Sequence, residues 1–332
     1  MAANWMRRTF AIAACASATL LAACGGSSTV DSVTPTRIIS FGDTVSDLGQ
    51  GPSGARYTVN DGSVNNWIAE VAYRYGITAT AANAGGAGYA RGNARVTLAD
   101  ASGVTNAPSV TQQVDAFLAG GGSFTPTDFV FIGGGQSDII AGMNEYLAGT
   151  KTQAEFNADM VTAAQQLGAQ VDRLVNAGAP HVLVSDSPNV SRSLWASQLN
   201  TAHPNANPMP DAVLQSAVSA FNQAALSAVG SYSGTKVLFV DLEGFFNSIS
   251  GTLGGSAGSG FSNNTAAICT TVDPTNGLNI GANQINSLLC NANTLLSGAT
   301  LSTYVFADPL NYTPAAHVVV GDRVYNRMKA NW

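Results

Sequence analysis

Residues 37–49 read RIISFGDTVSDLG, and this stretch decides how the rest of the chain is interpreted. A largely apolar run, Ile38 to Phe41, is followed by Gly-Asp and then by hydroxyl and acidic side chains, a pattern typical of a buried strand that ends in a tight turn. In an open α/β sheet, ligands bind outside the carboxyl ends of the strands, so the residues after Phe41 would be presented there. The pattern also fits a plain strand-turn-helix junction with a Thr or Ser cap.

This segment resembles block I of the GDSL, or SGNH, family of esterases and lipases, whose pattern is roughly Phe-Gly-Asp-Ser-Leu-Ser-Asp-x-Gly. The nucleophilic serine of that pattern falls on Thr44 in this chain, and the leucine falls on Val45. The resemblance implies a three-layer, doubly wound α/β fold of the SGNH-hydrolase and flavodoxin-like kind, with a mostly parallel sheet. It places Thr44 at the nucleophile and at one oxyanion-hole position. A threonine hydroxyl could attack an ester, but its methyl group crowds the nucleophile and favours other rotamers.

Two glycine-rich segments further along the chain resemble blocks II and III of the same family. Residues 89–96 read YARGNARV, and Asn93 stands where the family has a glycine whose backbone N–H donates to the oxyanion. That N–H survives the change, but the added side chain could occupy the hole. Residues 133–138 read GGGQSD, and Ser137 stands where the family has an asparagine whose amide donates to the oxyanion. A serine hydroxyl can donate one hydrogen bond there, although it could equally cap a helix over residues 138–147.

Residues 304–317, YVFADPLNYTPAAH, resemble block V, which reads Asp-x-x-His-Pro-Thr-x-x-Gly-His. Asp308 matches the acid of the catalytic triad, whereas Asn311 stands at the general base. His317 matches the second histidine, which lies in a helix and is not the base in the family. An amide is not basic near neutral pH, and loss of the base costs other hydrolases roughly 10^4 to 10^6 in rate.

The chain has three histidines, and we expect none of them to replace the missing base. His317 lies six residues beyond Asn311, more than one helical turn from the triad position. His181 begins a predicted strand and should lie at the opposite end of the sheet from Thr44, and His203 lies in a polar loop. Two hypotheses follow: an exported GDSL-type ester hydrolase with a degenerate site and weak or absent activity, or a non-catalytic lipoprotein whose cleft binds an acyl chain or glycan. Under both, these positions converge at one end of the sheet: Thr44, Asn93, Ser137, Asp308 and Asn311.

Apolar periodicity outside the blocks predicts helices and strands that alternate, which favours a mostly parallel sheet. A Gly/Ser/Asn-rich insertion is expected near residues 251–300, and residues 194–210 are expected to be irregular. Thr313 and Pro314 have the pattern of a cap and a first helical turn. The predicted strands are 38–41, 128–132, 181–186 and 236–241, and the predicted helices are 65–75, 109–119, 138–147, 152–177, 211–229 and 314–328.

Residues 1–23 have the features of a signal peptide: two arginines, a short apolar stretch and Leu-Ala-Ala before Cys24. This ending resembles a bacterial lipobox, in which Cys24 would be lipidated and would anchor the mature chain to a membrane. Cys15 fits the pattern too, but the apolar region before it is shorter, and an ordinary secretory peptide without lipid is the other alternative. Gly25, rather than an aspartate, implies the outer membrane. Residues 24–36 would be a flexible tether to a domain over 37–332.

Composition limits the kinds of partner that this chain could have. Only 10% of its residues are charged, against roughly 25% in typical proteins, and its net charge is −6. It has no basic run, so nucleic acid is excluded as a partner. In an exported chain, Cys269 and Cys290 predict a disulfide that contributes about 3 kcal/mol. We expect no metal, because no histidine lies near these cysteines, and we expect no cofactor and a monomer.

Overall fold

The computed structural model describes residues 33–232, 234–251 and 260–332. Residues 34–331 form one compact unit. The predicted signal peptide, Cys24 and most of the predicted tether lie outside the described residues, so the interpretations made there remain predictions. Among the described residues, no helix has the length and apolar character needed to cross a bilayer.

A parallel sheet of four strands forms the centre of the domain, with the order β1-β2-β3-β4. Each strand is a short, almost fully buried run, as expected for a parallel sheet covered on both faces. The α/β fold predicted from the sequence is thereby confirmed, consistent with the SGNH-hydrolase fold. The strands are β1 (Arg37–Phe41), β2 (Asp128–Ile132), β3 (His181–Ser185) and β4 (Val237–Val240).

The segment around Gly88 runs along the free edge of β1. Gly88 forms a parallel bridge with Ser40, and the N–H of Tyr89 donates to the Ser40 carbonyl at 2.7 Å. After β1, the chain therefore passes first to one edge of the sheet and then returns to β2 on the other side. Such a reversal creates the crevice at the carboxyl ends of the strands in which ligands bind in open α/β folds.

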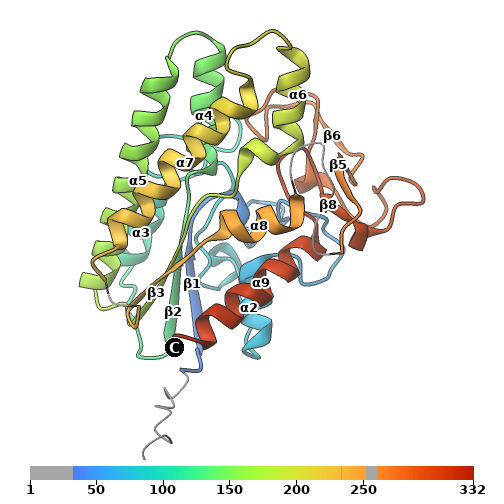
Figure 1. The fold of residues 1–332 in the computed structure, drawn as a ribbon. Coiled ribbons are helices and arrows are strands. Elements are labelled where there is room, and N and C mark those ends of the chain that lie inside the picture. Colours follow the sequence, from blue (N-terminus) through green and yellow to red (C-terminus); the bar gives the residue numbers. More distant parts are fainter. Residues whose placement is uncertain (1–32, 233, 252–259) are drawn as a thin grey trace, which may run out of the picture. The chain divides into compact units, whose positions relative to one another are not determined.

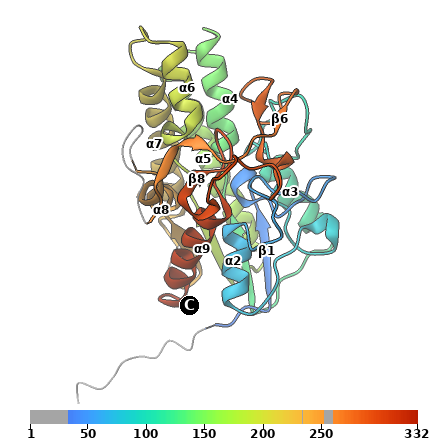
Figure 2. The ribbon, with the colours of Figure 1, turned by 90° about the vertical axis from the view of Figure 1, so that its right-hand side faces the viewer.

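Helices cover both faces of the sheet (Figure 1). On one face, α3 (Val110–Ala119), α5 (Gln153–Asn176) and α7 (Pro210–Val229) pack in one layer. On the other, α2 (Trp67–Arg74) and α9 (Pro314–Lys329) lie side by side in both views (Figures 1 and 2). The remaining helices of the described residues are α4 (Gln136–Leu147), α6 (Leu194–Ala202), α8 (Leu242–Ser250) and the short 3₁₀ turns η1 (Thr44–Ser46), η2 (Ala82–Ala84), η3 (Val190–Arg192), η4 (Ser287–Leu289) and η5 (Leu301–Thr303).

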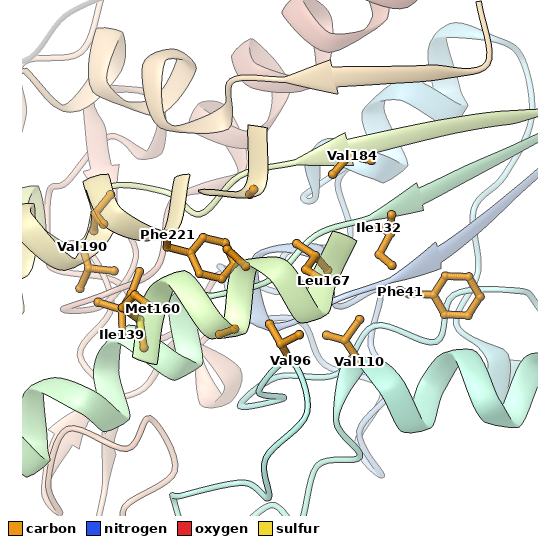
Figure 3. Packing of buried hydrophobic residues seen from close by; sticks show 14 of the residues in the cluster. Phe41, Val96, Val110, Ile132, Ile139, Met160, Leu167, Val184, Val190 and Phe221 are labelled. Atoms are coloured by element: carbon orange, nitrogen blue, oxygen red, sulfur yellow. The ribbon is translucent and has the colours of Figure 1, made fainter. Parts of the chain in front are cut away.

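Alternate side chains of the strands point to the two helical layers. Phe41 and Ile132 belong to the larger core cluster with side chains of α3, α5 and α7, and Figure 3 shows part of this packing. On the opposite face, Phe131 stacks on Trp67 of α2, with ring centroids 5.6 Å apart. The sheet is thus fixed from both sides, which holds the loops at its carboxyl end in place.

Helix α6 differs from the sequence prediction. Residues 194–210 were expected to be irregular, but α6 occupies the first half of that stretch. Ser193 caps it, because its Oγ accepts the N–H of Ala196 at 3.2 Å, and Trp195 is buried. The cap and the apolar first turn are both visible in the sequence. At α9, by contrast, the predicted Thr313 cap and Pro314 first turn are confirmed.

The insertion contains short strands and the predicted disulfide. Strand β5 (Asn263–Ala267) pairs with β8 (Tyr304–Phe306), and β6 (Val272–Asp273) pairs with β7 (Gln284–Ile285). Cys269 and Cys290 are bonded, with a Cα–Cα distance of 5.9 Å, which confirms the pairing. The insertion lies at the end of the domain to which the carboxyl end of β1 points (Figure 2).

Candidate active site

Thr44 lies in η1, directly after the carboxyl end of β1, and its side chain is buried. The turn before it is held by the side chain of Gln113 in α3. The amide oxygen of Gln113 accepts the N–H of Gly42 at 2.8 Å, and its amide nitrogen donates to the Gly42 carbonyl at 2.9 Å. One side chain from the neighbouring helix therefore fixes both backbone groups of the residue that turns the chain towards Thr44.

The backbone N–H of Asn93 donates to the Thr44 hydroxyl oxygen, with an N–O distance of 3.2 Å. Asn93 has a φ of +66°, a left-handed conformation that asparagine tolerates better than most residues. The preceding residue, Gly92, donates its N–H to the carboxylate of Asp47 at 2.8 Å. Asp47 thus ties the loop after Thr44 to the loop that carries Asn93. The sequence analysis missed Asp47, although an acid three residues after Thr44 in a tight turn was the available signal.

The side chain of Asn93 binds the insertion. Its Nδ2 donates to the carbonyl of Gly277 at 2.7 Å and to the hydroxyl of Thr105 at 3.2 Å. The Asn93 side chain therefore makes a contact between a predicted oxyanion-hole position and a segment 184 residues away. In the described part of the chain, this amide makes no hydrogen bond to Thr44.

Ser137 lies at the second residue of α4 and does not cap that helix. The helix begins at Gln136, two residues earlier than predicted, with Gly135 as its N-cap residue at a φ of +101°. A glycine tolerates this left-handed conformation. The cap prediction is wrong because Asp43 supplies the acceptor instead: its Oδ2 accepts the Gln136 N–H at 3.0 Å. The Ser137 hydroxyl is buried and has no hydrogen-bond partner among the described residues.

Two buried carboxylates connect the turns around Thr44 and Ser137. Burial, together with the charge of the nearby Asp138, raises the pKa of Asp43 to about 7, although N–H groups at the start of α4 oppose the shift. Asp138 accepts a hydrogen bond from Arg95 Nε at 3.0 Å and another from the Val96 N–H at 2.9 Å. Burial also raises the pKa of Asp138. These contacts join blocks I, II and III into one hydrogen-bonded unit.

Asn311 donates to the carboxylate that was expected to be the triad acid. Its Nδ2 lies 2.9 Å and 3.1 Å from the two oxygens of Asp308, which is fully buried. The backbone N–H groups of Leu310, Asn311 and Ser287 also donate to this carboxylate. In a serine hydrolase, the histidine donates one ring N–H to the acid and uses its other nitrogen as the base. Asn311 makes the first of these bonds, but it has no second nitrogen.

The three histidines lie apart from Thr44 or in surroundings that suppress their charge. His317 in α9 is buried, with the rings of Phe246 and Tyr312 at 5.9 Å and 6.3 Å, and burial lowers its pKa to about 3. His181 is the first residue of β3, at the opposite end of the parallel sheet from Thr44. His203 is exposed directly after α6. In the described part of the chain, no imidazole donates to or accepts from the Thr44 hydroxyl.

The fold and the order of these segments agree with one protein family. A family model described as GDSL-like Lipase/Acylhydrolase matches residues 38–324, from β1 into α9. The chain belongs to this family. Comparison with curated proteins gave no match. The stretch that matches the GDSL family model includes the five predicted site positions.

The structure brings two pairs of those positions into direct contact. Asn93 is bonded to Thr44, and Asn311 is bonded to Asp308, while Ser137 follows the residue that donates to Asp43. Convergence of all five at a single catalytic centre remains a prediction. Among the described residues, no group of three or more His, Cys, Asp or Glu side chains is close enough to hold a metal ion.

Proposed function

We propose that this chain keeps the scaffold of a GDSL-type ester hydrolase but hydrolyses esters weakly or not at all. The supporting observation is the contact between Asn311 and Asp308, where an amide holds the place of an imidazole. The Asn93 N–H donates to the Thr44 hydroxyl, and among the described residues no imidazole is hydrogen-bonded to that hydroxyl to take its proton. Without proton removal, a hydroxyl is a poor nucleophile near neutral pH.

The insertion adds a second reason for low activity, because it binds both halves of the site. The Gly277 carbonyl accepts from Asn93, and the Ser287 N–H donates to Asp308 at 2.9 Å. A third contact lies close by, where Asn144 of α4 donates to the carbonyl of Asn279 at 2.7 Å. All five predicted site side chains are at most 7% exposed. An ester would have to displace this segment to reach Thr44.

Hydrolysis of a short p-nitrophenyl ester tests this proposal. We expect the rate with the wild-type protein to equal the rate with Thr44→Ala, which removes the hydroxyl. A variant with Thr44→Ser, Asn93→Gly, Ser137→Asn and Asn311→His should gain activity. The same variant with Thr44→Ala in place of Thr44→Ser should lose it. Thermal unfolding of each variant checks that it is folded. A wild-type kcat in the ordinary enzymatic range, about 1 to 10^3 s⁻¹, that is lost in Thr44→Ala would overturn the proposal.

Binding without catalysis is the second candidate function. In this version, the chain is a monomeric, exported lipoprotein of the outer membrane that is anchored through Cys24. Its cleft holds an acyl chain or a glycan. The Ser137 hydroxyl supports this candidate, because it is a buried polar group without a hydrogen-bond partner among the described residues, and buried polar groups are normally hydrogen-bonded.

Labelling with an alkyne fatty acid tests the anchor in cells that express the protein. We expect incorporation that Cys24→Ala abolishes, whereas Cys15→Ala leaves it unchanged. Fractionation should place the labelled protein in the outer membrane, and size-exclusion chromatography should give the monomer mass. Ligand binding is tested with a fatty acid and an oligosaccharide, using Ser137→Ala as the variant. Saturable binding that Ser137→Ala does not weaken would exclude the Ser137 hydroxyl as a donor to the ligand.

A further inference from the structure

A cavity of about 440 Å³ lies outside the candidate active site, between two loops. One wall is formed within residues 48–56, shortly after Thr44, and the other within residues 78–84. Its volume is within the range of small-molecule sites in proteins. The two walls are already joined, because the backbone N–H of Asn83 donates to the side-chain oxygen of Gln50 at 2.9 Å, and Asn83 Nδ2 donates to the Gly51 carbonyl at 3.2 Å.

Arg56 lines this cavity and also a smaller one of about 210 Å³. Its guanidinium is held in place by two neutral acceptors. Nε donates to the Leu48 carbonyl at 3.2 Å, and Nη1 donates to the amide oxygen of Asn65 at 2.7 Å. A guanidinium has five N–H donors, so the two contacts orient it and leave donors for a ligand.

No acid of the described residues forms an ion pair with Arg56. Elsewhere in the domain, Arg37 is paired with Asp128 and Arg95 with Asp138. Asp47 is the acid that acts on Arg56 through its charge, but its carboxylate accepts the N–H groups of neighbouring loop residues instead. Burial lowers the pKa of Arg56 and outweighs the effect of Asp47. A partly desolvated charge without a partner is unfavourable, and an anion would relieve this cost.

We propose that this cavity, the Arg56 pocket, binds a small molecule through an oxyanion, either a carboxylate or a phosphate group. The planar guanidinium matches the geometry of both groups and can donate two parallel hydrogen bonds. The hydroxyls of Thr78 and Thr80, in the opposite wall, offer contacts to the polar remainder of the molecule. Because the chain has a net charge of −6, this arginine is not part of a generally basic surface. The pocket does not depend on hydrolysis at Thr44.

NMR titration of the folded, ¹⁵N-labelled protein with inorganic phosphate, and separately with acetate, tests the proposal. We expect saturable shifts of amides in residues 48–56 and 78–84, with the stronger anion identifying the preferred group. Arg56→Gln should weaken binding about tenfold or more, because it removes the charged donor. Ser53→Glu, at an exposed position of the lining, should weaken it by repulsion.

The matched control is Ser302→Glu, which adds the same charge at an exposed position that does not line the pocket. It should leave the affinity unchanged. If Arg56→Gln does not fold, the comparison between the two glutamate variants decides. The proposal is overturned if neither anion gives saturable shifts in these loops, or if Ser302→Glu weakens binding as much as Ser53→Glu does.

Discussion

The contact between the insertion and the candidate site should depend on the Cys269–Cys290 disulfide. Replacing both cysteines by serine removes a crosslink between residues 21 positions apart. On the chain-entropy model, a loop of this length contributes about 3 kcal/mol. The cluster of buried residues around the disulfide is small and consists of Val59, Ile268, Cys269, Cys290 and Ala307, while Leu278 of the insertion belongs to the larger core cluster. We therefore expect most of that free energy to be lost from the docking of the insertion.

Amide hydrogen exchange measures this effect at a single bond. The N–H of Ser287 donates to Asp308, so it exchanges only when the insertion leaves the site. A loss of about 3 kcal/mol should lower its protection about 100-fold. The amide of Phe131, in the middle of β2, serves as the control, and its protection should change much less because the sheet has its own core.

Two results would contradict this reasoning. Unchanged protection of Ser287 in the serine variant would mean that other contacts hold the insertion without the crosslink. An equal fall at Ser287 and Phe131 would mean that the insertion and the sheet unfold as one unit, so that the disulfide stabilises the whole domain. In the second case, the site could not open without global unfolding.

Three further predictions concern buried charges, each measured by urea unfolding. The pKa of Asp43 is about 7 in the folded protein, so the native state still holds a proton that the unfolded chain releases near pH 4. The free energy of unfolding should therefore fall by roughly 4 kcal/mol as the pH rises from about 4 to about 7, and Asp43→Asn should remove that fall. The opposite holds for His317, because its pKa is about 3 in the folded protein and the unfolded chain takes up the proton first as the pH drops below 6.5. Stability should therefore fall at low pH, and His317→Leu should retain more of its pH 7 stability at pH 4 than the wild type does. An unchanged pH profile would contradict this. Arg95→Met leaves Asp138 buried without its partner and should lower the free energy of unfolding by about 3 to 5 kcal/mol, and by less at low pH. A loss under about 1 kcal/mol would show that water reaches this carboxylate.

Local patterns were sufficient to predict the sheet. Strands β1 to β4 are short apolar runs bounded by turn residues, and parallel strands buried on both faces produce that pattern directly. Helix α6 was missed because its exposed half is polar, which hid the buried side chains of its first turn, such as Trp195. The start of α4 was misplaced because its cap is the Asp43 carboxylate, 93 residues away, and no local pattern records such a partner.

The candidate site could be predicted only in part, for the same reason. The resemblance to the GDSL family led to the prediction of Thr44, Asn93 and Asn311 as site positions, since each lies in a block of recognisable sequence. It could not supply the partner of the Asn93 side chain. That partner is a backbone carbonyl in the insertion, Gly277, and any residue type could provide it. Contacts of this kind become visible only when the chain is folded.

Under the proposed function, Asn93 and Asn311 both disfavour ester hydrolysis. Asn93 uses its amide to bind the insertion, and Asn311 uses its amide to bind Asp308. Changing Asn311 to histidine alone would supply a base but leave the insertion bonded to Asn93, whereas changing Asn93 to glycine alone would release one contact of the insertion but supply no base. Neither single change removes both obstacles to attack by the Thr44 hydroxyl, so their effects on ester hydrolysis should be strongly non-additive. Substantial activity from Asn311→His alone would mean that the insertion does not obstruct the site, and that the missing imidazole alone would account for the low activity that we propose.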